Sequence, residues 1–296
     1  MSKAKANNIE IEYDTFGDPS SEPILLIMGL GYQMIRWRVD FCNQLADRGF
    51  FVIRFDNRDV GLSTKLEELG IPDIMKASLA IQKGESVEAP YTLEDMAADA
   101  IGLLDFLNIE KVHVCGASLG GFIAQILAYK YPQRILTLTS IMSGTGNPEL
   151  PPAKPEVLQM LFSPPPSDRE PYIEFKIKQR RMIFGTGFPF DEDEQRLIAA
   201  ESYDRCHYPP GYTRQLMASI VSGDRRSKIA TIKTPTLVIH GANDPLVLVE
   251  HGRDTAKIIP ESELLIIEGL GHTMEAPGSW PQMINRISQI AQKTNA

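Results

Sequence analysis

The feature that most constrains this 296-residue chain is a serine between two glycines, where a strand-like segment meets a helix-like one. Residues that favour strands fill positions 112–115, and apolar side chains recur at helical spacing over 122–131. Gly116 and Gly120 flank Ser118 at the junction. They permit a sharp turn that lifts the serine hydroxyl clear of the backbone, beside the free N–H groups of a helix start. The stretch therefore predicts a strand, a strained turn and a helix, with a nucleophile at the turn.

Short apolar runs alternate with helical patterns over the first half of the chain. Thr92 and Asp95 resemble a capping box before one of these helices. Strands that alternate with helices indicate βαβ units and a mostly parallel sheet, with ligands at the carboxyl ends of the strands. No structure is assigned to residues 64–90, where glycine and proline interrupt every pattern. The expected strands are 9–14, 24–28, 50–55, 112–115 and 135–142, and the other expected helices are 37–48 and 93–107.

A long proline-rich passage, residues 145–228, interrupts this alternation. A parallel crossover needs only a dozen or more residues, so the passage predicts an inserted lid subdomain. Residues 1–144 and 229–296 then form the core. The many aromatic and apolar side chains of the passage either form its own small core or line a pocket over the serine. Its expected helices lie near 173–184 and 192–203, and the sheet pattern resumes with strands at 236–240 and 263–267 and a helix at 280–292.

Composition limits the partners that this chain can have. Its formal net charge is −8 and it has no cluster of Lys and Arg, which argues against nucleic acid or an anionic membrane surface as a partner. The first residues lack the apolar run of a signal peptide, and no stretch reaches the ~18 apolar residues of a membrane span. We therefore expect a cytoplasmic protein. Monomer and homodimer both stay open.

The cysteines and histidines predict neither a disulfide framework nor a metal site. Cys42, Cys115 and Cys206 are far apart and form no CxxC pair, which is typical of reduced thiols. No grouping of His, Cys, Asp and Glu has the spacing of a metal site. We therefore expect no metal and no cofactor.

An acid and a histidine follow later strands of the predicted sheet. Asp244 lies four residues past strand 236–240, and His272 lies five past strand 263–267. Because the carboxyl ends of parallel strands meet at one edge, we expect both side chains beside Ser118. A serine hydroxyl needs a base to remove its proton, and the base needs a carboxylate to hold its tautomer. The three residues therefore predict a catalytic triad.

Three motifs in this order resemble those of the α/β-hydrolase superfamily, and the resemblance covers essentially the whole chain. It implies the α/β-hydrolase fold, a mostly parallel central sheet flanked by helices, with a helical lid inserted after the sixth strand. The three motifs are Gly-Ala-Ser-Leu-Gly at 116–120, His-Gly-Ala-Asn-Asp-Pro at 240–245 and Gly-Leu-Gly-His at 269–272. Three further segments, 28–31, 58–63 and 184–190, are similar to bacterial carboxylesterases of the aclacinomycin methylesterase type.

The resemblance implies a role for each residue of the site. Ser118 is the nucleophile, His272 the general base and then acid, and Asp244 the acid that orients the histidine. The backbone N–H groups of Leu30 and Leu119 form the oxyanion hole.

The expected substrate pocket is apolar. Many relatives carry His-Gly where this chain has Met28-Gly29. Because the nearby oxyanion donor is a backbone group, this change leaves the hole intact and makes the pocket wall more apolar. We expect Met28, Gly29, Phe184 and Phe188 to line this pocket.

Other polar residues are interpreted as structural. His113 and His240 lie within strands and are expected to be hydrogen-bonded there, whereas His207 and His251 are expected to be solvated. The charged turn at 56–59 is expected to fix its own loop through internal pairing.

The resemblance implies a carboxylesterase-type serine hydrolase that acts on a small-molecule ester through an acyl-enzyme intermediate. Its substrate is expected to be a small to medium apolar ester. The same triad also serves perhydrolysis, lactone hydrolysis or carbon–carbon bond hydrolysis, and a binding protein of this fold without turnover is a further alternative. Dehalogenases and epoxide hydrolases of this fold use an aspartate nucleophile, so Ser118 argues against both.

Overall fold

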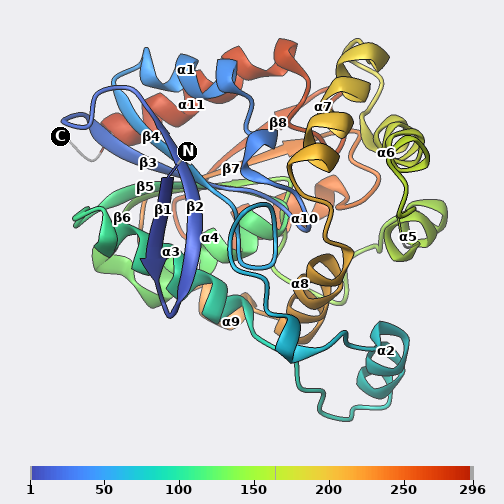
Figure 1. Cartoon of the computed structure of the whole chain (residues 1–296). Helices are drawn as coiled ribbons and strands as arrows, with labels where there is room; N and C mark the ends of the chain where they lie inside the picture. Colours follow the sequence, from blue (N-terminus) through green and yellow to red (C-terminus); the bar gives the residue numbers. More distant parts are fainter. Residues whose placement is uncertain (1, 164, 294–296) are drawn as a thin grey trace.

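An eight-stranded sheet runs through the centre of the computed structural model, which describes residues 2–163 and 165–293 (Figure 1). Strands β3 to β8 are parallel, and β1 and β2 join the β4 edge in antiparallel pairs. The spatial order is β1-β2-β4-β3-β5-β6-β7-β8. This confirms the predicted mostly parallel sheet. The strands are β1 (Ser2–Ala6), β2 (Ile9–Phe16), β3 (Glu22–Ile27), β4 (Phe50–Phe55), β5 (Val112–Ala117), β6 (Ile135–Ile141), β7 (Thr236–Gly241) and β8 (Glu263–Ile267).

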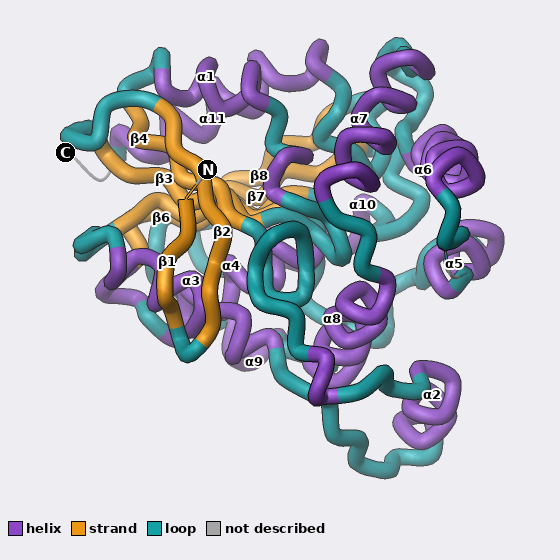
Figure 2. The backbone as a smooth tube through the Cα atoms, viewed as in Figure 1, coloured by secondary structure: helices purple, strands orange, loops and turns teal. Residues whose placement is uncertain are grey.

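Helices cover both faces of the sheet (Figure 2). One face carries α1 (Val39–Ala46) and α11 (Trp280–Gln292), and the other carries α3 (Leu93–Phe106), α4 (Leu119–Lys130) and α10 (Val249–Ile258). The helices between β6 and β7 are α5 (Pro155–Phe162), α6 (Arg169–Ile183), α7 (Glu192–Arg205), α8 (Pro209–Ser222) and α9 (Arg226–Ile229). We call these the inserted helices. Short helices also occur at α2 (Ile74–Gln82), η1 (Met34–Arg36), η2 (Glu67–Leu69), η3 (Pro132–Arg134) and η4 (Pro277–Ser279).

The inserted helices follow the sixth strand along the chain, where the sequence predicts a lid. The boundaries 145–228 and the lid role stay predictions. Met1 and residues 294–296 of the predicted core, and residue 164 of the predicted lid, lie outside the described residues.

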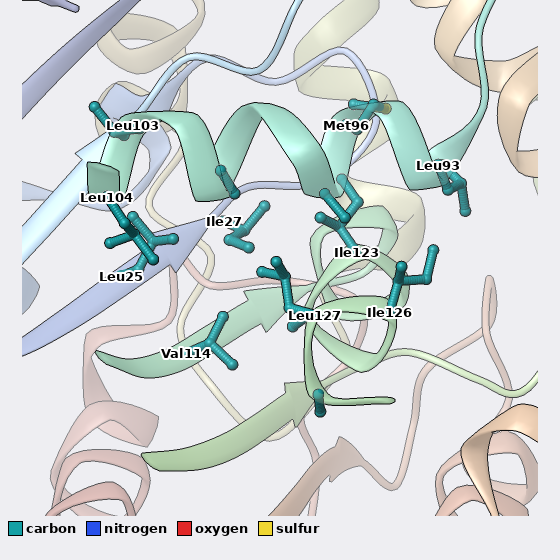
Figure 3. Close-up of a cluster of buried hydrophobic side chains, with 14 of the residues drawn as sticks. Leu25, Ile27, Leu93, Met96, Leu103, Leu104, Val114, Ile123, Ile126 and Leu127 are labelled. Atoms are coloured by element: carbon teal, nitrogen blue, oxygen red, sulfur yellow. The ribbon is translucent and has the colours of Figure 1, made fainter. Parts of the chain in front are cut away.

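Alternating strand residues feed two separate hydrophobic cores. On β3, Leu25 and Ile27 point to the α3 and α4 face, and Ile24 and Leu26 point to the α1 and α11 face. Figure 3 shows the first of these cores, where side chains of α3 and α4 pack on Leu25, Ile27 and Val114. Because each strand is covered on both faces, it reads as a continuous apolar run in the sequence.

Two elements escaped the sequence patterns for different reasons. β1 has the sequence Ser-Lys-Ala-Lys-Ala, which has no strand-forming side chains, and it forms because the turn at Asn7 and Asn8 pairs it with β2. Both asparagines have positive φ, 47° and 66°, as a tight hairpin turn requires. In α2, the apolar side chain of Met75 faces solvent and is 67% exposed, so the helix lacks the usual buried stripe.

The capping box predicted before α3 is confirmed. The Asp95 N–H donates to Thr92 Oγ1 at 3.1 Å, and the Thr92 N–H donates to Asp95 Oδ2 at 2.8 Å. Aspartate therefore serves here in place of the more common glutamate.

The charged turn after β4 binds other segments of the chain. The expectation of internal pairing is therefore incomplete, because the strongest partners come from outside the loop. Arg58 forms an ion pair with Asp99 of α3 at 2.6 Å. Asp59 pairs with Arg214 of α8 through two hydrogen bonds of 2.8 Å. The turn thereby fixes an inserted helix to the core.

We predict that Arg214→Met lowers the free energy of unfolding by about 3–5 kcal/mol, because it leaves the carboxylate of Asp59 buried without its cation. The Asp59 side chain is 0% exposed, so water cannot replace the lost partner. Urea denaturation followed by circular dichroism measures the change. Arg196→Met is the matched control, because Arg196 forms ion pairs with the exposed glutamates Glu174 and Glu192 and its loss should leave the midpoint almost unchanged. Equal midpoints for the two variants would contradict the prediction.

Candidate active site

The turn between β5 and α4 holds Ser118 in a strained conformation, with φ 55° and ψ −120°. The flanking glycines are required by close backbone packing. A Cβ on Gly116 would lie 2.1 Å from the carbonyl oxygen of Gly120, and a Cβ on Gly120 would lie 2.1 Å from that of Ile27. Larger residues at either position would push β5, α4 and β3 apart. This is why the serine can stand at the edge of the sheet on so tight a turn.

The structure brings Ser118, His272 and Asp244 together. His272 Nε2 lies 3.0 Å from Ser118 Oγ, and His272 Nδ1 lies 2.7 Å from Asp244 Oδ2. Because the carboxylate accepts from Nδ1–H, Nε2 carries the lone pair that accepts the serine proton. Such a chain of hydrogen bonds can activate a hydroxyl.

Asp244 is buried and fully hydrogen-bonded. Its Oδ1 accepts from the N–H groups of Leu246 and Val247, each at 2.9 Å, and Oδ2 faces His272. Burial alone would raise the pKa of Asp244, but the charge of His272 and hydrogen bonds from His240 and His272 lower this pKa to about 2. The carboxylate therefore stays ionised at neutral pH. His240 itself is buried in β7, as expected, and its Nε2 lies 2.7 Å from the carbonyl oxygen of Val247.

The backbone of the loop that carries His272 is fixed by the last residue of α6 and the residue that follows it. The His272 N–H donates to the carbonyl oxygen of Ile183 at 2.6 Å, and the Gly271 N–H donates to that of Phe184 at 2.9 Å. The two segments lie so close that a Cβ on Gly271 would be 2.1 Å from the Ile183 oxygen. The position of the imidazole therefore depends on contacts between two backbones.

Two unpaired amides lie beside the serine. Within residues 2–163 and 165–293, the N–H groups of Leu30 and Leu119 have no hydrogen-bond partner, and both residues line the same cavity as Ser118. The loop that carries Leu30 is held by a hydrogen bond of 2.9 Å from the Gly31 N–H to Gln215 Oε1. This loop can approach Ser118 closely because Gly29 has no side chain; a Cβ on Gly29 would lie only 3.1 Å from the Cβ of Ser118. The two free donors are suited to bind an oxyanion.

A cavity of about 410 Å³ opens over Ser118. Met28 and Gly29 line it, as expected, but Phe184 and Phe188 do not. Phe184 is 2% exposed and packs on Phe190 in the core beneath α1 and α11, and Phe188 packs against the same core. The expectation for these two phenylalanines is therefore wrong: the neighbouring backbone holds the His272 loop, while their rings face away into the core.

The cavity wall also contains residues that the sequence patterns did not single out. His207, in the loop between α7 and α8, and His251 of α10 line it and are half-buried, whereas the sequence predicts that both are solvated. Charged side chains from η1, α6 and the loop after His272 are also present, at Arg36, Lys176, Arg180 and Glu275. The sequence patterns gave no signal for these four charged residues.

The described residues contain neither a candidate metal site nor a helix able to cross a membrane. Among residues 2–163 and 165–293, no three His, Cys, Asp or Glu side chains are grouped so that they could hold a metal ion. Across the same part of the chain, each helix is too short or too polar to cross a membrane.

Comparisons with known proteins support both resemblances drawn from the motifs. Residues 22–274 match the family described as alpha/beta hydrolase fold. The chain is 31% identical over 279 residues to the rhodomycin D methylesterase DauP of Streptomyces sp. (strain C5), covering 87% of each chain. Its identity to the rhodomycin D methylesterase DnrP of Streptomyces peucetius is 30% with the same coverage. A thermophilic esterase from Thermogutta terrifontis, 22% identical, shares the fold with a TM-score of 0.71 over 100% of this chain and 99% of its own.

We predict that Gly271→Ala slows the reaction of Ser118 with a fluorophosphonate about 100-fold, because the added Cβ displaces the His272 loop from the Ile183 oxygen. The rate of covalent labelling, followed by mass spectrometry, measures this change. Gly84→Ala is the control: Gly84 has φ +76° but a Cβ there meets nothing within 4 Å. Equal labelling rates for both variants would show that the backbone contact does not position the imidazole.

Proposed function

Because this chain belongs to the α/β-hydrolase fold family, we propose that it is a carboxylesterase that uses Ser118 as its nucleophile. The observation that carries the proposal is the chain of hydrogen bonds from Asp244 through His272 to Ser118, at the wall of the cavity. Ester hydrolysis is further supported by the two methylesterases to which the aligned part of the chain is 31% and 30% identical.

The first half of the reaction transfers the acyl group to Ser118. As Oγ attacks the ester carbonyl, His272 Nε2 takes the serine proton, and Asp244 stabilises the imidazolium that forms. The negative oxygen of the tetrahedral intermediate accepts hydrogen bonds from the N–H groups of Leu30 and Leu119. His272 then gives the proton to the departing alcohol. This sequence of steps is supported by the 3.0 Å and 2.7 Å distances on either side of His272.

The second half returns the enzyme to its starting state. Water enters once the alcohol has left, and His272 Nε2 takes its proton as the oxygen attacks the acyl group on Ser118. The same two amides hold the second oxyanion, and the proton returns to Ser118 Oγ as the acid leaves.

The inserted helices act as a lid in this proposal. They contribute much of the cavity wall, and a closed wall excludes water from the acylation step. The apolar lining and the volume of about 410 Å³ suit a small to medium ester with an apolar chain. Apolar lining side chains include Leu30, Met142, Leu158, Phe175 and Leu216.

Several expectations from the sequence stay predictions. These are the cytoplasmic location, the monomer or homodimer, and the use of the same triad for lactone hydrolysis, perhydrolysis or carbon–carbon bond hydrolysis.

We predict that the protein hydrolyses p-nitrophenyl butyrate and that Ser118→Ala lowers its turnover about 1,000-fold or more, because the variant has no hydroxyl to acylate. Release of p-nitrophenol measures turnover, and circular dichroism checks that the variant is folded. Ser20→Ala, in the exposed turn before β3, is the matched control and should keep the wild-type rate. A Ser118→Ala rate close to that of the control would mean that another group is the nucleophile.

A further inference from the structure

Three cations surround one aromatic ring in the cavity wall. The guanidinium carbons of Arg36 and Arg180 lie 4.9 Å and 4.5 Å from the centre of the Tyr32 ring, and Lys176 Nζ lies 5.4 Å from it. Arg36 belongs to η1, and Lys176 and Arg180 lie one turn apart on α6. All three line the cavity that contains Ser118. We call Arg36, Lys176 and Arg180 the cationic cluster.

The cationic cluster has one carboxylate partner among the described residues. Glu275 Oε1 lies 2.6 Å from Arg36 Nε and 3.1 Å from Arg180 Nη2. Its other oxygen already accepts from the hydroxyl of Thr273 at 3.1 Å. Lys176 forms no ion pair within residues 2–163 and 165–293, and donates to the neutral amide of Gln179 at 3.1 Å. Three cations and one anion leave an excess of positive charge in a wall of a chain whose formal net charge is −8.

Some hydrogen-bond donors of the cationic cluster are also unused. In the described part of the chain, Arg36 Nη2 and Arg180 Nε are buried and have no hydrogen-bond partner. Buried polar groups are usually paired, because an unpaired donor has lost its water without a replacement. Lys176 lines the cavity and is half-buried, so part of its side chain stays accessible. The side chains of Arg36 and Arg180 are only 5% and 7% exposed. The lysine can contact an anionic ligand directly, and the charges of the two arginines stabilise that ligand.

We propose that the cavity binds esters that carry a carboxylate at the end of an otherwise apolar chain, and that the cationic cluster binds this carboxylate. The inference rests on the proposed function, and it names the class of ester within it. A carboxylate fits better than a neutral end because it supplies the missing counter-charge. The free-energy cost of removing the carboxylate from water is offset by its attraction to three cations, which Tyr32 and Glu275 already hold in place.

The test compares each half-methyl ester of the straight-chain dicarboxylic acids, from succinic to sebacic, with the methyl alkanoate of matching length. For the best half-ester, we expect Lys176→Gln to lower the ratio of its kcat/KM to that of the neutral ester about 10- to 100-fold, since a charged hydrogen bond is lost. Lys176→Arg keeps the charge and should retain most of the ratio. Lys178→Gln, on the exposed side of the same helix, is the matched control and should keep all of it. An unchanged ratio in Lys176→Gln would overturn the proposal.

A binding measurement separates this inference from the proposed function. Calorimetric titration of monomethyl adipate and methyl hexanoate into the Ser118→Ala protein needs no turnover. We expect tighter binding of monomethyl adipate, and loss of that difference when Lys176→Gln is added. If the wild type hydrolyses no ester but this difference is found, the carboxylate site stands and the proposed function fails. If the two esters bind equally, the carboxylate site is refuted whatever the turnover.

Discussion

The candidate site depends on close contact between backbones at the carboxyl edge of the sheet. At Gly116, Gly120 and Gly271, an added Cβ would come within 2.1 Å of a neighbouring carbonyl oxygen. Real Cβ atoms do not approach oxygen so closely, so the segments can meet only because these positions have no side chain. The serine and the histidine are thereby held by rigid peptide groups rather than by flexible side chains. This accounts for hydrogen bonds of normal length between residues that are 154 positions apart in the chain.

Much of the sheet and the meeting of the three site residues could be predicted because both depend on local pattern and on parallel topology. β4, β8 and α11 have the predicted bounds, since each is a clear run or stripe bounded by turn residues. The direction of single side chains outside such elements could not be predicted. The sequence predicts Phe184 in the cavity because it is an aromatic residue of the expected lid, but its ring direction depends on how the 183–187 backbone pairs with the His272 loop. Likewise, the cationic cluster forms only when α6 packs beside η1.

Charge has different roles in the turn after β4 and in the cavity wall. In the core, the acids of the turn after β4 are buried and paired with arginines of the inserted helices, as Asp59 is with Arg214 and Asp56 with Arg205 at 2.7 Å. Breaking such pairs is costly, so they specify where the inserted helices sit more than they add net stability. In the cationic cluster of the cavity wall, by contrast, three cations share one carboxylate. The same residue types thus fix the architecture in one place and leave a charge for a ligand in the other.

Helix α6 contributes both to the cationic cluster and to the contacts that hold the His272 loop. It carries Lys176 and Arg180 on one side, and the residues at its C-terminal end, Ile183 and Phe184, accept hydrogen bonds from Gly271 and His272. The proposed ligand-binding side chains and the backbone contacts of the His272 loop therefore belong to one continuous helix and the residue that follows it. If the cationic cluster binds a carboxylate as proposed, a ligand that shifts α6 also shifts the Ile183 and Phe184 carbonyl groups that hold the His272 loop.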